Sequence, residues 1–300
     1  MDEAHGPHFG SHPAFPASAV ALGAAAAIVS AHKALGSLGQ AALLHVSAGA
    51  SPGFLPALDT ALASLQTSSP SYLLLASLDG GRAAAFEGGG AAWAEPLAAA
   101  GGVRAAAGGA PGVRVLPGAD PLRITLAVDG PASGPPSTCC GLGVAAALEA
   151  GGAVAEAALP GGAVVLACGA GSREGDVRAF SAALASVLAA RDAGRLPLVA
   201  AAAVIPDAAA ACSSSPSSLS PADALFGGRP VESVPLTSAR AVGRVAAEAV
   251  TPYPPGIPAL LPGEVVTAAA VAGVRAALAA GGRVNCADPT GWSVCVFVGV

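Results

Sequence analysis

The stretch Ala24–Gln40 reads AAAAIVSAHKALGSLGQ, a short apolar run that ends at Ser30 and leads directly into His32 and Lys33. A short run of Ala, Ile and Val bounded by a polar residue is typical of a buried strand. In open α/β sheets, ligands bind beyond the carboxyl ends of the strands. The stretch therefore predicts an α/β fold in which His32 and Lys33 lie at a ligand-binding edge.

Lys33 is the single lysine among the 14 Lys and Arg residues of the chain, and all five histidines lie within the first 45 residues. Arginine stays protonated, whereas a lysine can lose its proton and form a Schiff base, more readily when it is buried. A hydroxyl such as that of Ser30 can bind a phosphate, and an upstream carboxylate such as Asp2 can pair with a pyridine nitrogen. The pattern suits pyridoxal phosphate; the alternative is a surface lysine beside a core histidine.

Composition narrows the class of protein. The 300 residues are 53% hydrophobic and 11% charged, enough apolar content for a core, and the net charge of −5 disfavours nucleic-acid binding. The longest apolar runs are too short to span a bilayer. Six cysteines without a C-x-x-C spacing indicate buried, reduced thiols and a reducing compartment such as the cytoplasm. We expect neither a nucleic acid nor a membrane as partner.

Hydrophobic periodicity predicts alternating helices and strands along the chain. Helices are expected at 56–65, 91–104, 141–149, 174–190 and 267–280, and strands at 121–128, 163–167 and 293–298. The stretch 35–46 is expected to be helical or buried. Residues 80–118 are rich in Gly and Ala with little to bury, and 206–220 has the low complexity of a linker.

Three other motifs are poor guides to function. Asp2–His5 spells a helicase box, but the chain lacks the lysine-containing phosphate loop that such an enzyme needs. Gly141-x-Gly143-x-x-Ala146 resembles a dinucleotide fingerprint without a clear strand before it. The spacing of His5, His8 and His12 would suit a metal on a helix, but the intervening Gly and Pro residues break any helix there, so we expect no metal site.

Several motifs, in order along the chain, resemble the prokaryotic-type ornithine/lysine/arginine decarboxylases, which depend on pyridoxal phosphate. The segments that carry the resemblance are Asp2–Gly6, His8–Gly10, Ser30–Gln40, Ser68–Asp79, Asp120–Thr125, Pro252–Glu264 and Asp288–Thr290. The resemblance implies a partial fold-type-I pyridoxal-phosphate large domain over 1–118, a small α+β domain over 119–200, a linker over 201–220 and a C-terminal decarboxylase domain over 221–300.

The resemblance also implies roles for individual residues. Lys33 would hold the cofactor as a Schiff base and His32 would lie over the cofactor and substrate. Ser30 would contact the phosphate, Asp2 would pair with the pyridine nitrogen, and His5 would lie nearby. Glu264 would help to shape a substrate entrance. The implied reaction is decarboxylation of arginine, lysine or ornithine toward polyamines.

Members of the family carry a long segment before the Asp-Glu-Ala-His motif, whereas here Met1 directly precedes Asp2. We therefore expect the chain to correspond to the C-terminal portion of a decarboxylase, with Asp2 at a frayed terminus and weak activity. We expect a homo-oligomer, or a chain that pairs with an intact paralogue. The alternative function is a non-catalytic paralogue that modulates an active decarboxylase.

Overall fold

The computed structural model describes residues 1–88, 90–133, 137–159, 161–200, 218–236, 238, 240–253, 256–279 and 282–299. The chain forms two compact units. Unit 1 comprises Met1–Pro111, Val115–Thr125 and Leu166–Ala182, and unit 2 comprises Gly112–Arg114, Leu126–Val165 and Ala183–Val300. The domain boundaries expected from the sequence stay a prediction.

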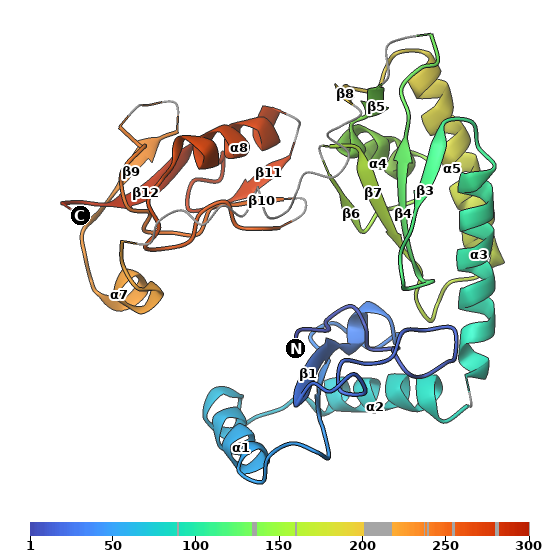
Figure 1. Ribbon diagram of the computed structural model, residues 1–300, viewed down its shortest axis with the longest axis horizontal. Coiled ribbons are helices and arrows are strands. Elements are labelled where there is room, and N and C mark those ends of the chain that lie inside the picture. Colours follow the sequence, from blue (N-terminus) through green and yellow to red (C-terminus); the bar gives the residue numbers. More distant parts are fainter. Residues whose placement is uncertain are drawn as a thin grey trace. The chain divides into compact units, whose positions relative to one another are not determined.

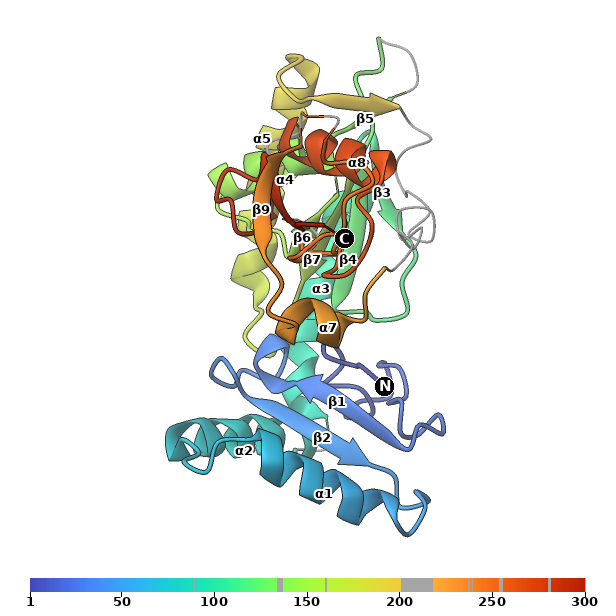
Figure 2. The ribbon, with the colours of Figure 1, turned by 90° about the vertical axis from the view of Figure 1, so that its left-hand side faces the viewer.

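A two-stranded antiparallel sheet and its helices begin unit 1. Strand β1 (Ala26–Ser30) pairs with β2 (Ala42–Val46), and the 3₁₀ turn η1 (Ala31–Lys33) follows β1 directly. Ala27 and Val29 of β1 are buried while Ile28 is exposed, as the alternation of a strand requires. The expected strand before His32 is thus confirmed. The helices are α1 (Phe54–Leu65), α2 (Tyr72–Phe86), η2 (Ala91–Trp93) and α3 (Ala94–Gly108), the first two seen near β1 and β2 in Figure 2.

Two expectations for unit 1 need correction. The stretch 35–46 is not a helix, and only its last five residues form a strand, because Gly36 and Gln40 both adopt a φ of 73° and interrupt any regular element. Residues 80–118 contain more buried side chains than their composition suggested. Helix α3 packs one face through small side chains, namely Pro96, Ala99, Ala100, Val103 and Ala107.

A four-stranded sheet has the order β3-β4-β7-β6. Its strands are β3 (Val113–Leu116), β4 (Arg123–Val128), β7 (Ala163–Ala167) and β6 (Ala157–Ala158), and β5 (Ser137–Cys139) pairs separately with β8 (Leu198–Ala200). Helices α4 (Gly141–Ala150) and α5 (Glu174–Asp192) occur between strands. The predicted strands at 121–128 and 163–167 and the predicted helices at 141–149 and 174–190 are confirmed.

The C-terminal part of unit 2 has its own core. Its elements are α7 (Pro221–Phe226), β9 (Val231–Pro235), β10 (Thr251–Tyr253), α8 (Ala268–Ala279), β11 (Arg283–Asn285) and β12 (Ser293–Phe297), drawn in orange to red in Figure 1. Strand β9 pairs with β12 and β10 with β11, both antiparallel. The buried cluster is mostly valine and leucine, including Val234, Leu236, Val250, Leu260, Val274 and Val294. Most of the expected linker over 201–220 lies outside the described residues.

Two further expectations from the sequence concern membrane-spanning segments and the burial of the cysteines. No helix among the described residues is long and apolar enough to cross a membrane. The five described cysteines are free thiols, but only Cys139 and Cys140 are buried; Cys168, Cys286 and Cys295 are half-buried. The expectation that all the thiols are buried is therefore wrong for these three, which lie at the margins of their cores.

The neighbours Leu260 and Leu261 offer a matched test of the C-terminal core. Leu260 is 0% exposed and Leu261 is 45% exposed. Leu260→Ala should lower the free energy of unfolding by about 2–5 kcal/mol because it leaves a cavity, and Leu261→Ala by about 0.5 kcal/mol. Urea unfolding followed by Trp292 fluorescence, in a Trp93→Phe background, measures both. Equal losses would contradict the described core.

Candidate functional site

Lys33 lies where the sequence placed it, at the carboxyl end of β1. The chain leaves the strand at Ser30 and turns through η1, so that Ala31 is buried while His32 and Lys33 face outward. Lys33 is exposed, so the burial expected of this amine is not provided by the described residues. The structure thus confirms the position of Lys33 but corrects its surroundings.

The N-terminal segment is a second strand-like partner of β1, and this segment runs parallel to β1. Asp2 bridges Ile28 in parallel, the Ile28 amide donates to the Met1 carbonyl at 3.1 Å, and the Ser30 amide donates to the Ala4 carbonyl at 3.1 Å. The expectation of a frayed terminus at Asp2 is therefore wrong. Because the two segments are parallel, the residues that follow each of them, His5 and Lys33, come to the same end.

Three basic side chains meet at this end, and we call Lys33, His5 and Arg123 the basic cluster. Lys33 Nζ lies 3.1 Å from His5 Nε2, and Arg123 donates to His5 Nδ1 from the other side. Arginine has only donors, so Nδ1 of His5 is the acceptor in this contact. The Nε2 atom of His5 is the one that faces Lys33 Nζ. Sequence reasoning missed Arg123 as a site residue, although it lies in the Asp120–Thr125 motif.

The other predicted residues, His32, Asp2 and Ser30, each have a separate position or contact near β1. His32 donates from Nδ1 to the Ala41 carbonyl at 3.0 Å, which leaves its Nε2 for another partner. Asp2 accepts the Ala4 amide on Oδ1 at 2.9 Å, which holds its carboxylate beside the parallel pairing. Ser30 is the half-buried last residue of β1. Lys33 and His5 are the two predicted residues whose side chains the structure brings into contact.

Glu264 belongs to unit 2 and has a local contact. Its Oε2 accepts the Leu261 amide at 2.8 Å and closes a turn, next to Gly263, whose φ is +94°. The carboxylate therefore stabilises its own loop, and its expected part in a substrate entrance stays a prediction.

His8 and Asp120 form a buried pair in unit 1. His8 Nε2 lies 3.1 Å from Asp120 Oδ1, and the same oxygen accepts the Leu122 amide at 2.9 Å. Burial by itself raises the pKa of the Asp120 carboxyl, but the hydrogen bonds from His8 and Leu122 outweigh it and hold that pKa below its usual value. Among the described residues, no group of three or more potential ligands could hold a metal ion.

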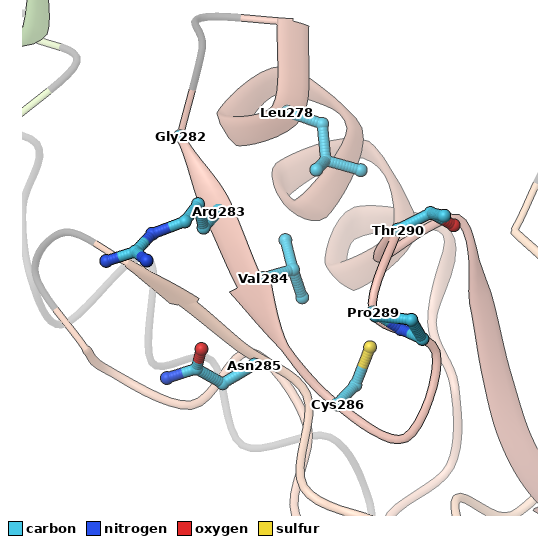
Figure 3. A pocket seen from close by; sticks show the side chains of 8 residues that line it. All are labelled: Leu278, Gly282, Arg283, Val284, Asn285, Cys286, Pro289 and Thr290. Carbon is cyan, nitrogen blue, oxygen red and sulfur yellow. The ribbon is translucent and has the colours of Figure 1, made fainter.

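Two cavities are lined by residues other than those of the basic cluster. One, of about 450 Å³, is in the C-terminal part between α8 and β11; in Figure 3, Val284 and Cys286 lie on one side of β11 and Arg283 and Asn285 on the other. Burial raises the pKa of the Cys286 thiol, which makes it a poor nucleophile. The other, of about 440 Å³, lies against Val29 and His45. Neither cavity is lined by a lysine amine, whereas Lys33 and His5 are in contact at the end of β1.

Comparisons with known proteins cover both ends of the chain. The family profile "Orn/Lys/Arg decarboxylase, major domain" matches residues 1–115, and "Orn/Lys/Arg decarboxylase, C-terminal domain" matches 209–279. The chain belongs to the Orn/Lys/Arg decarboxylase family. The arginine decarboxylase of Halalkalibacterium halodurans is 46% identical over 82 residues, which cover 27% of this chain and 16% of that protein. That of Bacillus subtilis is 44% identical over 79 residues, covering 26% and 16%.

Solved lysine decarboxylases share the fold. The constitutive lysine decarboxylase of Escherichia coli matches with a TM-score of 0.67 at 19% identity, over 91% of this chain and 49% of that one. Lysine decarboxylase A of Pseudomonas aeruginosa matches with a TM-score of 0.65 at 21% identity, with the same coverage. The chain therefore has the mixed α/β fold of this family, and it spans about half the length of these relatives.

The residues at the end of β1 fit pyridoxal phosphate in their chemistry. The site offers one amine able to add to an aldehyde, a carboxylate fixed by a backbone amide, and an imidazole with one nitrogen left over. The amine and the imidazoles lie at the carboxyl ends of two parallel segments, where α/β folds bind phosphorylated ligands, while Asp2 pairs with Ile28 in the middle of β1. The exposure of Lys33 and His32 means that these residues alone do not exclude water.

The His8–Asp120 pair predicts a specific acid sensitivity. A carboxyl whose pKa is lower in the folded than in the unfolded chain stabilises the fold above the unfolded-state pKa, and this contribution is lost as pH falls through the folded-state pKa. Asp120→Asn should therefore cost about 1–3 kcal/mol near neutral pH, and this loss should shrink below about pH 4. Urea unfolding across pH measures the loss, with the exposed Asp59→Asn as control. A loss that is the same at every pH would contradict the assignment.

Proposed function

We propose that this chain is part of a pyridoxal-phosphate-dependent decarboxylase that acts on a basic amino acid, arginine, lysine or ornithine, toward polyamines. The observation that carries the proposal is the single lysine of the chain at the carboxyl end of β1, in contact with His5, within the segment that matches the major domain of the family. The names of the relatives favour arginine or lysine as substrate.

Each residue of the site has a task in this proposal. When bound, pyridoxal phosphate supplies an electron-accepting ring for cleavage of the bond to the α-carboxylate. Lys33 provides the amine that carries the cofactor, while His5 orients that amine through Nε2. His32, whose Nδ1 is fixed on Ala41, presents Nε2 to the cofactor or substrate. Ser30 offers a hydroxyl to the phosphate.

Asp2 is the carboxylate that we propose pairs with the pyridine nitrogen of the cofactor. A carboxylate beside the pyridine nitrogen keeps that nitrogen protonated, which makes the ring a better electron acceptor. The Ala4 amide occupies one oxygen of Asp2, so the other is the oxygen proposed for this contact. In this proposal the enzyme is cytoplasmic and works as a homo-oligomer.

A second candidate function is a non-catalytic chain that pairs with an intact decarboxylase. The observation in its favour is an apolar surface on α1 and α2, where Leu65 is 86% and Tyr72 is 82% exposed. Such side chains are normally covered in an assembled protein. Mixing this chain with a full-length decarboxylase and measuring both complex formation and activity would distinguish this function from catalysis by the chain itself.

Cofactor attachment at Lys33 is the direct test of the proposal. Incubation with pyridoxal phosphate, reduction with borohydride and peptide mapping should place the label on Lys33, since it is the one side-chain amine of the sequence. The matched variant Lys33→Arg keeps the charge but cannot form the bond, so it should lose the label. Label confined to the α-amino group of Met1 in both proteins would overturn the assignment.

Turnover by the chain alone should be slow. Lys33, His32 and His5 are exposed, so water competes with every hydrogen bond to cofactor and substrate. We expect release of carbon dioxide from arginine, lysine and ornithine at less than about 1 s⁻¹, below the usual range for enzymes. A rate well above this in the purified chain, lost in Lys33→Arg, would show that the described residues suffice for catalysis.

A further inference from the structure

His8 is among the most completely buried polar side chains of the described residues. It is 1% exposed, and three aromatic rings enclose it: Phe9 at 4.9 Å, Phe15 at 4.6 Å and Trp93 at 5.6 Å between ring centroids. Since Asp120 is held as an anion and can only accept, His8 Nε2 donates to it. In such a water-excluded site a charge-assisted hydrogen bond is strong, and its partners have no alternative in solvent.

Asp120 fixes the backbone that carries Arg123. Its side-chain oxygen accepts the Leu122 amide at 2.9 Å, and its carbonyl accepts the Arg123 amide at 3.1 Å. From helix α3, Arg104 donates to the carbonyls of Asp120 at 3.2 Å and Arg123 at 2.6 Å. The start of β4 is therefore fixed by a network whose buried end is Asp120.

His8 fixes the turn that carries His5. The Gly6 amide donates to the Glu3 carbonyl at 2.8 Å, and the Phe9 amide donates to the Gly6 carbonyl at 3.0 Å. A Cβ on Gly6 would lie 2.5 Å from the Phe9 ring, so the turn is too tight for a side chain there. The position of His5 therefore depends on the position of His8, because the turn between them has little conformational freedom.

We propose that the buried His8–Asp120 pair is a positioning element for the basic cluster, holding His5 and Arg123 beside Lys33. The pair joins residues 5–9 to residues 120–123, and these segments supply the two partners that meet at the end of β1. The described contacts of His8 and Asp120 do not include Lys33; the pair acts through His5 and Arg123. The inference rests on the proposed function in one respect, the role of Lys33 in catalysis.

The single lysine gives this proposal a readout that needs no cofactor. Lysine labelled with ¹³C at Cε produces one side-chain resonance, from Lys33, whose offset from free lysine reports the His5 contact. We expect His8→Leu to lose most of that offset and His5→Ala to lose as much. Adding His8→Leu to His5→Ala should cause no further change, because a residue that acts through another has no effect in its absence.

Matched variants separate positioning from general destabilisation. His8→Gln keeps a donor toward Asp120 and should retain the Lys33 offset, whereas Asp120→Ala, which removes the acceptor, should lose it as His8→Leu does. Val103→Ala removes buried volume in α3 without touching the pair and should leave the offset unchanged. If His8→Leu does not fold, Asp120→Ala takes its place in the same cycle.

Two outcomes would overturn the proposal. One is an unchanged Lys33 resonance in a folded His8→Leu or Asp120→Ala variant. The other is an equal change with and without His5, which would mean that the pair is merely structural. Failure of pyridoxal phosphate to label Lys33 would instead count against the proposed function and would leave the result of this cycle standing.

Discussion

Strand β1 has to satisfy its backbone hydrogen bonds on both edges, and the rest of the site depends on how it does so. Its buried side chains, Ala27 and Val29, place the strand in the interior of unit 1, where unpaired amides and carbonyls are costly. On one edge β2 pairs with it in antiparallel fashion, and on the other the N-terminal residues pair in parallel. The parallel edge brings His5 to the end at which Lys33 emerges.

The site is built in two layers with different solvent exposure. The outer layer consists of three exposed side chains, Lys33, His5 and His32, which solvent and a ligand can reach. The inner layer consists of His8, which aromatic rings enclose, and the buried Asp120, and this pair connects two segments far apart in the sequence. This division is physically reasonable, since a reactive amine must be accessible while the groups that orient it are held best where water cannot compete.

Several elements could be predicted from the sequence because their signals are local. The apolar run ending at Ser30 indicated β1, and the spacing of leucines over 56–65 indicated α1. The short strands β9, β10 and β11 were not predicted, since each has too few residues for a periodic pattern and forms only by pairing with a distant partner. The helix expected over 35–46 was wrong for a related reason. The left-handed backbone at Gln40, a residue with a Cβ, is set by the turn between β1 and β2.

The sequence by itself determined the chemistry: one lysine, preceded by His32 and Ser30 at the end of a strand, in a chain whose motifs match a decarboxylase family. Only the tertiary structure decided which side chains accompany that lysine. Arg123 lies 90 residues from Lys33 along the chain and Asp120 lies 112 residues from His8. No local pattern predicts such meetings, because they follow from strand pairing and burial, which depend on the whole of unit 1 folding at once.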